Sequence, residues 1–132
     1  MALDIGVGGD SALAPNQTEP KLSLEDDGYY WFLSDLFDQL KAETGQYIDL
    51  YGNATFPTSQ LDALERTVAA AKELVDAQGE SWKVHTGTQL LPVRKEVYQV
   101  VKREEFQRLL TEWAQVVVRA RELDKPVVCF GD

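Results

Sequence analysis

The chain has 132 residues, the length of a typical single domain, and 44% of them are hydrophobic and 27% charged, as in average globular proteins. Its 13 Lys and Arg residues against 22 Asp and Glu give a net charge of −9, which argues against binding to nucleic acid or anionic membranes by phosphate neutralisation. The single cysteine, Cys129, excludes an internal disulfide and every CxxC metal or redox motif. We therefore predict one folded domain over residues 1–132 that uses no cofactor.

The N-terminal third predicts a strand, a loop and a long helix. Apolar residues alternate over 3–7, which is typical of a short strand with one buried face. Residues 8–22 are polar and contain glycine and proline without any period, so we expect a surface loop there. A capping-box pattern at 23–26 precedes apolar residues at helical spacing, which predicts a helix over about residues 25–44 that ends at Gly45.

The middle of the chain predicts a short strand, a helix and a hairpin. The apolar patch at 47–51 suits a short strand or extended segment. A second capping-box pattern at 59–62 opens an amphipathic helix that we expect to end near Gly79. The segments 82–88 and 93–101 alternate and are rich in β-branched and aromatic residues, so they predict a β-hairpin.

The C-terminal third predicts a helix and a buried strand. Residues 106–120 carry a broad apolar stripe at helical spacing, with acidic residues before it and arginines at its end. The continuous apolar run at 127–130 is typical of a strand covered on both faces, and so of a central position in a sheet. The predicted fold class is α+β, a single domain in which three amphipathic helices pack on a small mixed β-sheet containing a hairpin.

No catalytic or metal-binding motif stands out. His85, the only histidine, lies in an alternating segment on the face opposite Trp82 and Val84, so we expect it to face solvent. A nucleophilic Cys129 would need an activating environment that the sequence does not provide, so we expect a core cysteine. The acidic residues lack the spacing of a calcium loop, and the N-terminal glycines lack the Lys-Ser/Thr of a phosphate loop. We predict no catalytic and no metal-binding residue.

Charge and aromatic residues concentrate near the N-terminus. Residues 1–40 carry eight acidic residues and one basic residue, a net charge of −7, whereas residues 41–132 carry −2. The consecutive Tyr29, Tyr30 and Trp31 cannot all face the core from one helix, so at least one large aromatic should be exposed. Tyr and Trp are enriched at binding hot spots. The predicted partner-binding residues are Asp26, Asp27, Tyr30, Trp31, Asp35 and Asp38.

The C-terminal region carries a resemblance to a known group of proteins. The closing Lys-Pro-Val-Val-Cys-Phe-Gly-Asp at 125–132 follows an amphipathic helix and, together with the hairpin over 82–101, resembles small uncharacterised bacterial proteins. Some of these are similar to the immunity proteins of polymorphic-toxin and type VI secretion systems, and the resemblance covers Tyr47 to the end. It implies neutralisation of a cognate toxin by direct binding, with no catalytic residues.

These observations predict a non-enzymatic acidic binding protein, an immunity- or antitoxin-like inhibitor of a basic toxin or effector. The protein partner would be basic, and neither nucleic acid nor membrane is expected as a partner. The first ten residues lack the pattern of a secretory signal and no apolar run approaches a membrane span, so we expect a cytoplasmic protein. Two alternatives stay open: a small ligand-binding or enzymatic domain with a pocket near the 8–22 loop, and a structural homo-oligomer.

Overall fold

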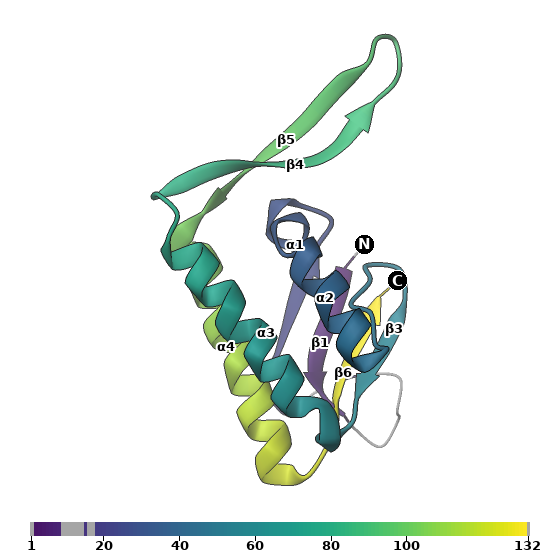
Figure 1. Cartoon of the computed structure of the whole chain (residues 1–132), viewed down its shortest axis with the longest axis vertical. Coiled ribbons are helices and arrows are strands. Elements are labelled where there is room, and N and C mark those ends of the chain that lie inside the picture. The colour runs from purple at the N-terminus through teal and green to yellow at the C-terminus, as the bar shows by residue number, and fades with distance from the viewer. Residues whose placement is uncertain (1, 9–14, 16–17, 132) are drawn as a thin grey trace.

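The computed structural model describes residues 2–8, 15 and 18–131 and shows an α+β fold. The described residues form six strands and four α-helices (Figure 1). In chain order they are β1 (Ala2–Val7), β2 (Lys21–Glu25), α1 (Gly28–Phe32), α2 (Ser34–Thr44), β3 (Asn53–Phe56), the 3₁₀ turn η1 (Thr58–Gln60), α3 (Leu61–Asp76), β4 (Ser81–Gln89), β5 (Lys95–Lys102), α4 (Arg103–Leu123) and β6 (Val127–Gly131).

The strands form two separate antiparallel sheets. The larger sheet has the order β2-β1-β6-β3, with Ile5 of β1 opposite Leu22 on one side and Cys129 on the other. β4 and β5 pair only with each other among the described strands. The predicted mixed sheet is therefore wrong, because every pairing is antiparallel and the hairpin is a sheet of its own rather than part of the main one.

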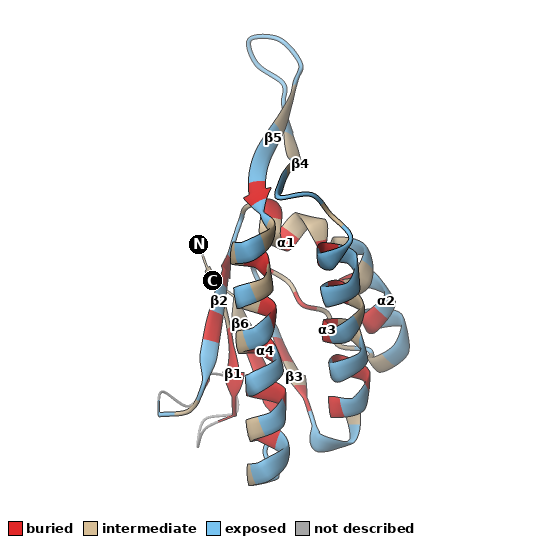
Figure 2. Ribbon diagram, turned by 90° about the vertical axis from the view of Figure 1, so that its left-hand side faces the viewer, coloured by how far each residue is buried: buried red, intermediate tan, exposed pale blue. Residues whose placement is uncertain are grey.

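The helices form one layer on the larger sheet (Figures 1 and 2). α4 packs on β1 and β2, α3 lies beside α4, and α2 lies beside α3. Buried residues alternate with outward-facing ones along the edge strand β2, where Leu22 and Leu24 are buried and Ser23 is exposed. This alternation places the single hydrophobic core between the sheet and the helix layer.

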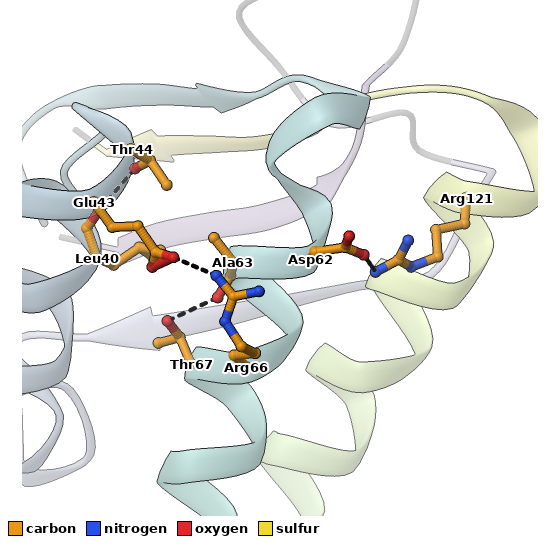
Figure 3. Close-up of polar contacts among 8 residues, drawn as sticks. All are labelled: Leu40, Glu43, Thr44, Asp62, Ala63, Arg66, Thr67 and Arg121. Carbon is orange, nitrogen blue, oxygen red and sulfur yellow. Dashed lines mark hydrogen bonds and ion pairs between the residues drawn. The ribbon is translucent and has the colours of Figure 1, made fainter.

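Ion pairs join α3 to the helices on either side of it (Figure 3). Arg66 of α3 pairs with Glu43 of α2, and Asp62 of α3 accepts a hydrogen bond of 2.6 Å from Arg121 of α4. All four side chains are substantially exposed, so the pairs add little to stability but favour one alignment of neighbouring helices.

The β4–β5 hairpin projects beyond the rest of the molecule, and we call residues 81–102 the arm (Figures 1 and 2). Its base is fixed to the helices by aromatic packing. Trp82 stacks on Phe106 with ring centroids 6.1 Å apart and meets Phe32 edge-on at 5.1 Å. The backbone N–H of Gly28 also donates to the side chain of Gln99 at 3.0 Å. The arm is therefore rooted on α1 and α4 while its far end extends into solvent.

Most of the predicted elements after residue 57 are confirmed. The two amphipathic helices correspond to α3 and α4, and the predicted hairpin corresponds to β4 and β5. The apolar run at 127–130 forms β6, which lies between β1 and β3 with Val127, Val128 and Cys129 buried, as expected for a central strand. The first strand is also confirmed as β1.

The prediction of one continuous helix over 25–44 is wrong. Residues 21–25 form β2 instead, because their alternating pattern pairs with β1, and the helix begins at Gly28 with Asp27 as its N-cap. The helical path then breaks at Leu33, whose backbone is not helical, into α1 and α2. Gly45 ends α2 in the left-handed conformation, as predicted.

Two further expectations change. Of the short strand or extended segment expected at 47–51, the strand is wrong, because those residues form no strand and β3 follows at 53–56. The loop expected at 8–22 extends too far, because residues 21 and 22 belong to β2. Most of that loop, residues 9–14 and 16–17, lies outside the described residues, and so does the pocket proposed beside it.

Within the described ranges, no helix is long and apolar enough to cross a bilayer.

Candidate functional site

The predicted acidic and aromatic residues meet at a surface formed by the β2–α1 turn and the segment before β3. One carboxylate oxygen of Asp26 accepts a hydrogen bond of 2.8 Å from the indole N–H of Trp31. Its other oxygen accepts a hydrogen bond of 3.3 Å from the hydroxyl of Tyr51. Asp26 thus joins two aromatic side chains that lie twenty residues apart in the sequence.

More negative charge surrounds this contact. Asp49 accepts a hydrogen bond of 3.1 Å from the backbone N–H of Tyr51. The pKa of the Tyr30 hydroxyl is raised mainly by burial, next by Tyr47, and further by the negative charges of Asp49 and Asp38. We call the group Asp26, Trp31, Asp38, Asp49 and Tyr51 the acidic corner.

Tyr51 is the more exposed of the two aromatic residues in the acidic corner. The residue is 56% exposed, and the negative charge of Asp26 raises the pKa of its hydroxyl. The Tyr51 hydroxyl already donates to Asp26, so it can accept a hydrogen bond from a partner while its ring packs against an apolar group, and the carboxylates attract cations. The corner therefore presents negative charge beside an exposed aromatic ring.

Asp35 is the remaining predicted carboxylate on this side of the molecule. It lies in the first turn of α2, three residues before Asp38, so the two acids occupy one face of the helix. Both side chains are exposed. The acidic surface therefore continues from the corner along α2.

Two of the predicted partner-binding residues have structural roles instead. Tyr30 is only 2% exposed and donates a hydrogen bond of 2.8 Å from its hydroxyl to the carbonyl of Ile48, so the core holds it. Asp27 accepts a hydrogen bond of 3.0 Å from the backbone N–H of Tyr29 and caps α1, and partial burial raises its pKa. Neither side chain is available to a partner in the way that the sequence suggested.

The expectation that at least one large aromatic among residues 29–31 is exposed is also wrong. Tyr29 and Trp31 are half-buried, because Tyr29 packs edge-on against Phe106 at 5.0 Å and Trp31 packs against the core. The exposed aromatics are Tyr51 and Tyr98. The sequence indicated the exposure of these two residues only weakly: Tyr51 precedes the turn residue Gly52, and Tyr98 lies on the alternating hairpin.

The two residues considered for nucleophilic chemistry are not placed together. Cys129 is buried in the larger sheet, where burial raises its pKa to about 12. His85 is exposed on the arm, as predicted, and its Nε2 lies 2.5 Å from Glu96. Thiolate chemistry at Cys129 is disfavoured by its high pKa, so its position agrees with the expected core cysteine.

Over residues 2–8, 15 and 18–131, no three His, Cys, Asp or Glu side chains gather closely enough to hold an ion.

Comparisons with family models, with curated proteins and with solved structures give no match for this chain.

Proposed function

We propose that this protein binds a basic protein partner through the acidic corner. The observation that carries the proposal is the Asp26 contact, in which one carboxylate holds both Trp31 and the exposed Tyr51 at an acidic surface. Long-range attraction between opposite charges speeds the encounter, and aromatic side chains at the centre of an interface slow its dissociation. The corner supplies both kinds of group in one place.

The narrower form of the proposal is inhibition of a basic toxin or effector, as the resemblance to immunity proteins implies. A toxin that acts on an anionic substrate carries a basic active-site surface, and an acidic inhibitor is complementary to it. The first forty residues, with a net charge of −7, supply most of the negative field. Inhibition would follow from occlusion of that surface by direct binding.

The first test neutralises the carboxylates that surround the aromatic residues. In the triple variant Asp26→Asn, Asp35→Asn and Asp38→Asn, we expect the partner to associate about tenfold more slowly at low ionic strength, because long-range steering is lost. The difference should vanish near 1 M salt, where the Debye length falls to about 3 Å. The partner is first captured from the native cell on the immobilised chain and identified, and stopped-flow mixing then gives both rate constants.

A matched control separates the surface from the overall charge. The variant Asp76→Asn, Glu112→Gln and Glu122→Gln removes the same three charges from α3 and α4, away from the corner. We expect this control to capture the partner and to associate at close to the wild-type rate. A partner that binds the corner variant and the control equally well, or no partner specific to the wild-type chain, contradicts the proposal.

The aromatic residues should act on the dissociation rate constant of the complex. Tyr51→Ala removes an exposed ring whose loss leaves the core intact, and we expect faster dissociation of the partner at low and at high salt. Trp31→Ala should act in the same direction and also release the Asp26 carboxylate from its hydrogen bond. Dissociation rates unchanged in both variants would place the contact elsewhere. Urea denaturation of each variant verifies that the fold is retained.

A further inference from the structure

The arm carries most of the exposed large apolar side chains of the described chain. Eight such residues are exposed in all, and five of them belong to the arm. Leu91, at 79%, is the most exposed of the eight. The five are Leu90, Leu91, Val93, Tyr98 and Val100. A two-stranded hairpin with such a surface is marginally stable alone, and exposed apolar patches of this kind mark contact surfaces.

The arm also differs from the rest of the chain in charge. Residues 81–102 contain four basic residues and one acidic residue, Glu96, a net charge of +3 with His85 neutral. Because the whole chain carries −9, the remaining residues carry −12. We call the residues outside the arm the body. The positively charged arm is attracted to negatively charged surfaces such as that of its own body, and it is repelled by another arm. This opposition of charge favours a second copy of the chain as the partner of the arm.

The body offers an apolar groove that can receive it. The groove lies between α3 and α4, has a volume of about 410 Å³ and is lined mainly by apolar side chains. Its α4 side includes the exposed Ala114 and Val118, and its α3 side includes Val68 together with one acidic residue, Glu65, and one basic residue, Lys72. Small side chains at Ala69 and Ala114 leave room for the side chains of a visiting segment.

The arm is long enough to span the groove and lies away from its own groove. The part of β4 beyond Val84 has five residues and extends about 16 Å at 3.3 Å per residue. The groove-lining residues 65–72 of α3 extend about 12 Å along that helix at 1.5 Å per residue. The arm rises from the end of the α3–α4 pair and points away from its own groove (Figure 2), so it can reach only the groove of another molecule.

We propose that two copies of this chain form a symmetric dimer in which the arm of each copy docks in the α3–α4 groove of the other. The leucines and valine of the arm tip cover the apolar lining, and the basic residues of the arm face the acidic body. A two-fold axis makes the two contacts identical and closes the assembly at two chains. The surface used is separate from the acidic corner, so this dimer and the proposed partner binding can be tested independently.

Sedimentation equilibrium of the full chain over a concentration series tests the dimer. We expect the mass to rise from 14.8 kDa to twice that value. Leu91→Asp on the arm tip and Ala114→Asp in the groove should each weaken dimerisation by about tenfold or more, because each places a carboxylate in an apolar contact. Leu74→Asp is the matched control: this exposed leucine of α3 is not among the groove-lining residues, and its variant should dimerise like the wild type.

Mixing the two weakened variants identifies which surfaces meet. A Leu91→Asp chain keeps an intact groove and an Ala114→Asp chain keeps an intact arm, so their mixture regains one of the two contacts and should form more dimer than either variant alone. A wild-type chain that stays monomeric throughout the series overturns the proposal. Dimerisation that survives Ala114→Asp, or a mixture that shows no gain, overturns it as well, since the arm would then meet a different surface.

Discussion

Replacing Trp113 with alanine should reduce the free energy of unfolding by about 3–5 kcal/mol, a large share of the roughly 5–15 kcal/mol that holds a typical domain folded. Trp113 is the largest fully buried side chain, 1% exposed in the middle of α4, and its ring lies 5.9 Å from that of Phe37. Its removal leaves a cavity between the helix layer and the sheet. Urea denaturation should show a lower midpoint with an unchanged slope.

Two companion variants make this prediction specific. Trp113→Phe keeps an aromatic ring and removes an indole N–H that has no hydrogen-bond partner, so it should cost less than the alanine variant. Gln115→Ala alters an exposed residue of the same helix and should change stability by no more than about 0.5 kcal/mol. Equal midpoints for Trp113→Ala and Gln115→Ala would show that the α4 stripe does not face the core.

Gly28→Ala should destabilise the protein by about 1–3 kcal/mol through overpacking at the base of the arm. A β-carbon at Gly28 would lie 2.6 Å from a methyl group of Val101 and 3.3 Å from the β-carbon of Val84. Valine is stiff about its first side-chain torsion, so neither neighbour can turn away at low cost. Thermal unfolding followed by circular dichroism measures the loss of stability.

The clash itself can be tested with a double-mutant cycle. Val101→Ala removes the methyl group that the new β-carbon would meet, and the cavity it leaves lies beside Gly28. The double variant should therefore be more stable than the sum of the two single effects predicts. Strict additivity would mean that Gly28→Ala acts through the backbone of α1 rather than through the contact with β5.

Local patterns identified the elements whose period is long or unambiguous. The apolar stripes of α3 and α4 and the alternation of β4 and β5 were sufficient to predict these elements from the sequence, because each pattern repeats over several turns or residue pairs. Residues 21–25 were ambiguous. Their alternation, with Leu22 and Leu24 buried, suits a strand, yet Ser23 followed by acids also suits a helix N-terminus. Pairing with β1 decided in favour of the strand, and that pairing is not visible in a local window.

The candidate site depended even more on distant contacts. The sequence indicated an acidic surface near the N-terminus with aromatic residues, and Asp26 and Trp31 do lie together there. It could not show that Tyr51 joins them, because that contact requires the segment before β3 to fold back on the β2–α1 turn. Nor could it show that Tyr30 is directed inward, since consecutive residues of a short helix divide between core and surface according to its packing.

The central place of β6 in the larger sheet bears on how fast this protein folds. Leu3 in β1 lies opposite Gly131 in β6, so the pairing joins residues from opposite ends of the described chain. Forming such a contact closes a long loop, which costs conformational entropy before the contact contributes any favourable energy. Chains dominated by such contacts fold in milliseconds to seconds. The contacts of α3, the hairpin and α4 with one another join residues much closer in sequence than β1 and β6, so they close shorter loops. Until β6 docks, β3 has no strand beside it and one edge of β1 is open, and open strand edges are sites through which chains aggregate.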